Sequence, residues 1–133
     1  MLRESPTSTG GELNAAITSA VVGIQTRYLG RGPKTASTFH KDNVIVLLMY
    51  DVMTHAEKSL AQNSNEDAVT YMRHLFQKTM EAEFTEAVER LTGRKVIAFI
   101  SGNNVNPDVA SELFILDGPP NGETFSAQAV QPA

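Results

Sequence analysis

The sequence predicts an α+β domain in which helices cover a four-stranded, mostly antiparallel sheet made from two β-hairpins. Apolar residues recur at helical spacing over 11–29 and 66–92, and each of these stretches is followed by a pair of β-rich segments, at 35–50 and 96–117. The resulting element order is α-β-β-α-α-β-β once a short helix before residue 63 is included. Two hairpins of this kind can join into one sheet with helices on its surface.

Length and composition limit the class of protein. The 133 residues suffice for one domain, and we expect a flexible lead over 1–10, a single domain over 11–118 and a disordered tail over 119–133. The net charge of −4 argues against nucleic-acid binding, and the absence of cysteine excludes thiolate metal sites. The longest apolar run, Val44–Tyr50, is too short to cross a bilayer, and residues 1–12 hold no apolar core of a signal peptide. We therefore expect a cytoplasmic protein without a transmembrane segment.

The first helix is expected from Gly11 to Leu29. Gly30 provides a cap and Pro33 prevents continuation of the helix. The stripe predicted to be buried is Leu13, Ile17, Ala20, Val21, Ile24 and Tyr28, whereas Asn14, Thr18, Gln25 and Arg27 are predicted to lie outside it.

The first hairpin is predicted to pair residues 35–40 with residues 44–51 across a tight turn at Lys41–Asn43. The second of these strands is apolar at every position, which predicts a central strand. A short helix over 54–62 follows, with Thr54 as its N-cap.

The longest helix is predicted from Glu66 to Gly93, with Ser64 and Asn65 at its start and the glycine as its stop. A helix of roughly 27 residues would extend about 40 Å. It must therefore bend, break near Thr79 or reach a partner. The predicted buried stripe is Val69, Met72, Phe76, Met80, Phe84, Ala87, Val88 and Leu91, and the outer side carries Arg73, Gln77, Lys78, Glu81, Glu86 and Glu89.

The run at 96–100 is short and rich in β-formers, which predicts a second central strand. A turn-rich loop over 102–108 and a fourth strand over 110–117 complete the second hairpin. Because both inner runs are apolar on all sides, either helices cover both faces of the sheet or the second face is buried in an oligomer.

The loop Gly30-Arg31-Gly32-Pro33-Lys34 is the most unusual short segment. Its glycines would let backbone amides approach an anion, with Arg31 and Lys34 supplying charge. On the structural interpretation, which we favour, Gly30 caps the helix and Arg31 complements the helix dipole. Arg94 occupies the equivalent place in the second half. If the hairpins lie side by side, one basic patch would hold Arg27, Arg31, Lys34, Arg94 and Lys95, although two separate corners are the simpler expectation.

No catalytic constellation and no metal site are predicted. The three histidines are His40, His55 and His74. Asp51 and His55 have the i, i+4 spacing of one helix face, but Asp51 is expected to close a strand, and no His-Glu-x-x-His or comparable ligand set occurs. Glutamates at 81, 83, 86 and 89 are typical of a solvated helix face. The asparagines of 103–108 lack the spacing of a calcium loop, so a hairpin loop is the better interpretation.

The chain resembles the MpsC-like family over residues 11–118. The residues that carry the resemblance are Leu29-Gly30-Arg31-Gly32-Pro33, Val44-Ile45-Val46-Leu47-Leu48, Leu91-Thr92-Gly93-Arg94-Lys95-Val96 and Leu113-Phe114-Ile115-Leu116-Asp117. These are small bacterial proteins, long described as a domain of unknown function and named for a sodium-translocating, membrane-potential-generating system. The family loop is commonly Gly-Lys-Gly-Pro, and Arg31 here keeps the charge while changing the donor geometry. The resemblance implies a transport-linked role and no known active site.

Together these observations favour a non-enzymatic accessory or regulatory protein that acts through protein partners and forms a homo-oligomer. The resemblance implies peripheral contact with membrane transporter subunits. The alternative is a protein that binds a small anionic metabolite or a nucleotide through Gly30, Arg31, Gly32, Lys34 and Arg94. An enzyme with scattered carboxylates and histidines is a third hypothesis. No cofactor is expected.

Overall fold

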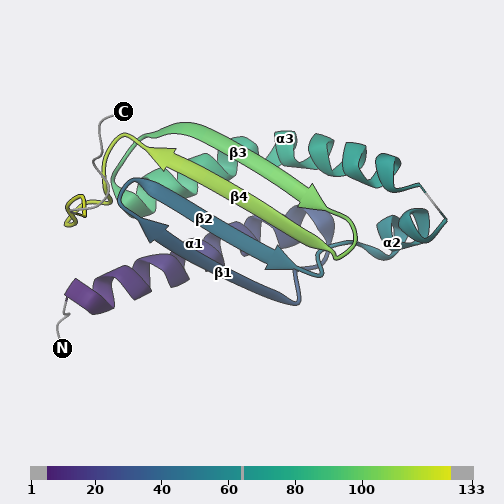
Figure 1. Ribbon diagram of the computed structural model, residues 1–133, viewed down its shortest axis with the longest axis horizontal. Helices are drawn as coiled ribbons and strands as arrows, with labels where there is room; N and C mark the ends of the chain where they lie inside the picture. Colours follow the sequence, from purple (N-terminus) through teal and green to yellow (C-terminus); the bar gives the residue numbers. More distant parts are fainter. Residues whose placement is uncertain (1–5, 64, 127–133) are drawn as a thin grey trace.

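The computed structural model describes residues 6–63 and 65–126 as one α+β fold (Figure 1). All strand pairs are antiparallel, and the strand order in the single sheet is β1-β2-β4-β3. The predicted fold class and element order are therefore confirmed. The elements are α1 (Pro6–Leu29), β1 (Thr35–Lys41), β2 (Val44–Tyr50), α2 (His55–Gln62), α3 (Glu66–Thr92), β3 (Val96–Asn104) and β4 (Val109–Leu116).

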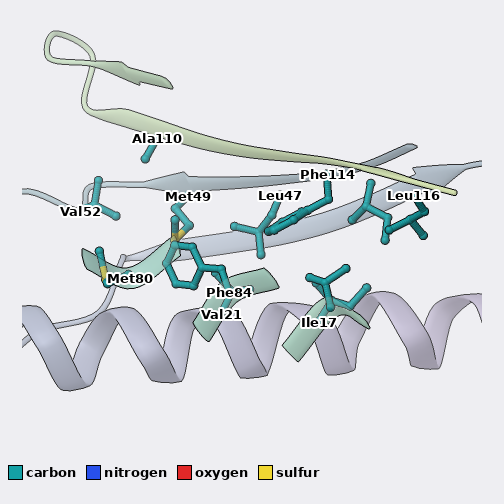
Figure 2. Packing of buried hydrophobic residues seen from close by; sticks show 12 residues of the cluster. Ile17, Val21, Leu47, Met49, Val52, Met80, Phe84, Ala110, Phe114 and Leu116 are labelled. Carbon is teal, nitrogen blue, oxygen red and sulfur yellow. The ribbon is translucent and has the colours of Figure 1, made fainter. Parts of the chain in front are cut away.

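The helices α1 and α3 lie together on one face of the sheet (Figure 1). Alternate residues of β2 and β4 point toward these helices, as the strict alternation of buried and half-buried positions along both strands shows. Figure 2 shows the resulting core, in which side chains of the sheet meet those of the two helices. The fully buried members include Ile17, Val21, Ile45, Leu47, Met49, Phe84, Val88, Phe114 and Leu116.

The prediction that residues 96–100 form a central strand is wrong. The hairpins join through β2 and β4, which leaves β3 at an edge of the sheet. Ile97 and Ile100 are accordingly 65% and 59% exposed. An apolar run has the same sequence pattern in a strand covered on both faces and in an edge strand whose outer face is bare, so the pattern alone did not separate the two.

Three predicted helix ends are confirmed. Gly30 and Gly93 have φ angles of 82° and 71°, the left-handed conformation that closes a helix. Thr54 caps α2, and Glu57 completes a capping box with it. The predicted start of α3 differs, because Asn65 makes no capping bond through its side chain, while Ser64 lies outside the described residues.

The helix α3 is continuous over its 27 residues, so the break considered near Thr79 does not occur. Its first turns, together with α2, extend past the end of the sheet (Figure 1). The predicted stripe holds at Val69 and over Met80–Val88. Between them it fails, because Phe76 is exposed and Arg73, predicted to be solvated, is buried. In α1, Gln25 is likewise buried against expectation.

Both ends of the domain differ from the expected boundaries. The helix α1 begins at Pro6 rather than Gly11. Residues 119–126, part of the segment expected to be a disordered tail, return to the body of the fold, where the Asn121 amide donates to Thr92 O (2.9 Å) and Ser126 bonds the Asp42 carboxylate. The rest of that expected tail, 127–133, and the first half of the expected lead, 1–5, lie outside the described residues.

Candidate functional site

The loop after α1 uses its cationic side chain within the chain. The Arg31 guanidinium donates to the carbonyls of Met53 (2.6 Å) and Asp51 (3.1 Å), and its Nη2 lies 3.8 Å from the Asp51 carboxylate. These contacts tie the end of α1 to the segment between β2 and α2. The geometry therefore gives Arg31 a structural role, and anion binding by this loop stays a prediction.

Of the other predicted binding residues, Lys34 lies at the same end of the sheet as Arg31, whereas Arg94 lies at the opposite end. Lys34 is exposed and its amide donates to Tyr50 O (2.9 Å), at the end of the sheet where β4 begins. Arg94 bonds the Pro119 carbonyl at the end where β4 stops. The length of β4 separates these ends by roughly 24 Å. Arg27 instead pairs with Glu83 of α3 (2.8 Å), so the single basic patch is not formed.

The histidines also lie apart. His40 contacts Asn14 Oδ1 through Nδ1 (2.6 Å) and Glu123 Oε1 through Nε2 (2.8 Å), which joins β1 to α1 and to the segment after β4. His55 and His74 are exposed. Among the described residues, no group of three or more acidic or histidine side chains is placed to hold a metal ion.

The face of the sheet opposite the helices carries exposed apolar side chains, and we call it the open face. Its positions are the odd-numbered residues of β1 and β4 and the even-numbered residues of β2 and of β3 after its bulge at Ile97. Strand register aligns Phe39, Val46, Leu113 and Ile100 in one row across all four strands.

The apolar surface continues beyond this row. The row on one side holds Lys41, Val44, Ile115 and Ala98, whereas on the other side Leu48 stands between Ser37 and Ser111. Tyr50 pairs with Val109 at the end of β2. Lys41 is the only charged side chain among these sheet positions of the four strands. No element of the described chain covers this face, and Phe39 and Ile100 are 52% and 59% exposed. Within residues 6–63 and 65–126, helices therefore cover one face of the sheet and not both, unlike the first of the two predicted arrangements.

A second feature lies on the covered side, where α2 and α3 meet the sheet. The Arg73 guanidinium donates to Glu57 Oε1 (3.3 Å) and to Asn103 Oδ1 (3.1 Å), while Glu57 Oε1 also accepts from the Thr54 amide (2.8 Å). Glu112 of β4 completes what we call the buried cluster, and the three charged residues are between 1% and 8% exposed. A buried charge requires partners in its surroundings, so this arrangement is energetically demanding.

The buried cluster is incompletely satisfied. Glu57 Oε2, Arg73 Nε and Glu112 Oε1 are buried without a hydrogen-bond partner in the described structure. They border a cavity of about 20 Å³, room for the centre of one water-sized sphere, which Gln25 and Gln77 also line. Burial raises the pKa of Glu112 to about 7, against the opposite effects of the Ser101 hydroxyl and the Arg73 charge.

Sequence reasoning did not identify this cluster. One available signal was Glu112, which shares the core-facing alternation of β4 with Ala110, Phe114 and Leu116. A carboxylate at such a position needs a cationic or donor partner. The sequence could not identify that partner. The helical pattern places Arg73 on the solvated side of α3, and only the packing of α2 brings Glu57 beside it.

Comparison with known proteins identifies one family. The model of the family described as "Na+-translocating membrane potential-generating system (MpsC)" matches residues 9–118, which is most of the chain. No curated protein and no solved structure matches the sequence. Across the described residues, no helix combines the length with the apolar character that spanning a bilayer requires.

Proposed function

The chain belongs to the MpsC family, and from this premise we propose that it is a non-enzymatic accessory protein of a Na⁺-linked membrane-potential system that works as a homodimer. The open face is the observation that carries the proposal. An apolar surface of this extent on a folded chain is typical of an interaction site. The proposal takes a second copy of the chain as the occupant of this surface.

The size of the open face suits this occupant. Four strands about 4.8 Å apart, with seven residues each at about 3.4 Å, give a footprint of roughly 450 Å² before side-chain relief is counted. Stable pairs bury about 800 Å² of accessible surface on each partner, which is of the same order. Sheets of this kind pack face to face at about 10 Å through interleaved apolar side chains.

The charge pattern favours a second copy over a charged partner. Lys41 stands at one corner, so the open face offers no pattern of charges for an acidic or basic surface to complement. A two-fold axis through the row of Phe39, Val46, Leu113 and Ile100 would bring apolar side chains together. It would also keep the two copies of Lys41 away from the centre, as a self-complementary interface requires.

The experiment that tests the dimer is sedimentation equilibrium of the wild type and of Ile100→Lys. Ile100 is exposed on an edge strand, so the charge should leave the protomer folded while placing two desolvated ammonium groups at the dimer interface. We expect a dimeric wild type and a monomeric variant with an unchanged circular dichroism spectrum. Leu75→Lys, an exposed site on α3 away from the open face, should remain dimeric. A monomeric wild type would refute the proposal, and so would an Ile100→Lys variant that remains dimeric.

The accessory role requires a second experiment in cells. A tagged wild-type chain and its Ile100→Lys variant, each crosslinked and recovered from the native cells, would be compared by quantitative mass spectrometry. Enrichment of integral membrane subunits of a cation-transport system with the wild type supports the role, and depletion of those subunits with the variant ties it to the dimer. Recovery of the chain alone would refute the transport link while leaving the dimer intact.

A further inference from the structure

The buried cluster lies where α2 and the first half of α3 meet the sheet, and the two halves of α3 are attached to the sheet in different ways. The second half of α3 packs on the sheet through apolar side chains, among them Phe84, whose ring meets Phe99 edge to face with centroids 6.3 Å apart. The first half extends beyond the sheet, and Tyr71 and Leu75 there are 64% and 48% exposed. Its link to β3 is the polar contact from Arg73 to Asn103, whereas the apolar Val69 is buried on the same side of the helix.

The charge of the buried cluster depends on one carboxyl group. Glu57 accepts hydrogen bonds from the Arg73 guanidinium and from the neutral Thr54 amide. The negative charge of Glu57 and the positive charge of Arg73 therefore balance. The charged groups that border the cavity beside Glu112 are Glu57 from α2 and Arg73 from α3, while α1 and β3 contribute the uncharged Gln25 and Asn103. The cluster is therefore neutral with Glu112 protonated and carries one net negative charge with Glu112 ionised.

We propose that the buried cluster is a proton-controlled latch, which holds α2 and the first half of α3 against the end of the sheet while Glu112 is protonated and releases them when it ionises. An uncompensated charge in a small cavity is costly, and access of water to the cavity removes most of that cost. Release occurs at this place because the apolar Tyr71 and Leu75 in the first half of α3 are exposed and so contribute little packing that would oppose it. The latch is independent of the homodimer.

Release would change the accessible surface. It would expose Val69, which is fully buried in the closed arrangement, beside the already exposed Tyr71 and Leu75. An alkaline shift would then present an apolar helical surface at the end of the molecule, away from the open face.

The latch is tested by hydrogen–deuterium exchange with mass spectrometry, with exchange times scaled for the intrinsic effect of pH. Peptides from 55–79 report on the latch, and peptides from 80–92 serve as an internal reference. With Glu112 titrating near 7 when closed and at 4.5 when open, protection of 55–79 should fall about tenfold between about pH 6 and about pH 8.5. Protection of 80–92 should not follow this change.

Two variants separate the latch from a general effect of pH. Glu112→Gln keeps the shape of the side chain without its titration, so protection of 55–79 should be the same at both pH values. Glu86→Gln, which removes an exposed carboxylate of α3 outside the buried cluster, should keep the tenfold change. Equal scaled protection of 55–79 in the wild type at both pH values would overturn the latch, as would the same change in Glu112→Gln. If Glu112→Gln does not fold, the pKa of the Glu112 carboxyl is measured in the wild type by carbon NMR. A Glu112 pKa near 4.5 would overturn the latch.

Discussion

The two faces of the sheet are made by alternate residues of the same strands, yet only one of them is completed by the chain. On the covered face, Leu47 and Phe114 are fully buried beneath α1 and α3. On the open face, Val46 and Leu113 are adjacent to them in sequence and equally apolar, but no described element lies over them. Both faces of the sheet thus carry apolar side chains, but the described helices cover only one of them.

The two sides of the sheet also differ in charge. On the covered side, Glu112 of β4 is packed with Glu57 of α2 and Arg73 of α3, whereas Lys41 is the only charged side chain at the sheet positions of the open face. A face closed within the chain can hold a polar group in a fixed network of partners. A face that packs against a separate molecule is better composed of uncharged residues. An unpaired charge buried there would oppose association.

The largest expected effect is on the free energy of unfolding, when one apolar side chain from each side of the sheet is shortened to alanine. Phe84→Ala on the covered side should lower the free energy of unfolding by about 3–5 kcal/mol, because it leaves a cavity in a fully packed core. Ile100→Ala on the open face should change it by less than about 0.5 kcal/mol in the monomer. Urea unfolding at a concentration below that of dimerisation checks both values. Equal losses would show that the two faces do not differ as the structure indicates.

The next effect concerns pH and arises from the covered face alone. The folded chain keeps the Glu112 proton up to a pKa of about 7, whereas the unfolded chain releases it near 4.5. Stability is therefore fully present below about pH 4.5, decreases as the pH rises to about 7 and is level above, with a total loss of about 3 kcal/mol. Urea unfolding at about pH 5 and about pH 8 measures this loss, which Glu112→Gln should abolish. Asp51, whose pKa is lowered by its hydrogen bond to Lys58, affects stability only in a more acidic range.

A smaller effect tests the connection that positions α1 on the covered face. Arg31→Ala removes the bonds to the carbonyls of Met53 and Asp51 and should cost about 1–2 kcal/mol. Lys34→Ala, at an exposed position of the same loop, should be nearly neutral. Thermal unfolding with and without phosphate or a nucleotide distinguishes the two roles of the loop. Loss of ligand binding at unchanged stability would favour the anion-binding alternative.

Much of the fold could be predicted because its signals are local. The helical spacing of Ile17 and Val21, the glycines after α1 and α3 and the cap at Thr54 each depend on residues within a few positions of one another. The errors came from contacts between distant residues. Residues 96–100 were assigned to a central strand because the order in which hairpins join is not encoded in the hydropathy of either hairpin.

The same distinction between local patterns and contacts of distant residues applies to the candidate sites. The apolar character of both strand faces, and hence the need for a second covering, was determined by the sequence alone, because alternation along a strand fixes which residues share a face. Only the tertiary structure decided which face stays open, since this depends on the side to which both helices fold. It alone also brought Glu57, Arg73 and Glu112 to one cavity, because long-range packing of α2, α3 and β4 sets the distances between charges.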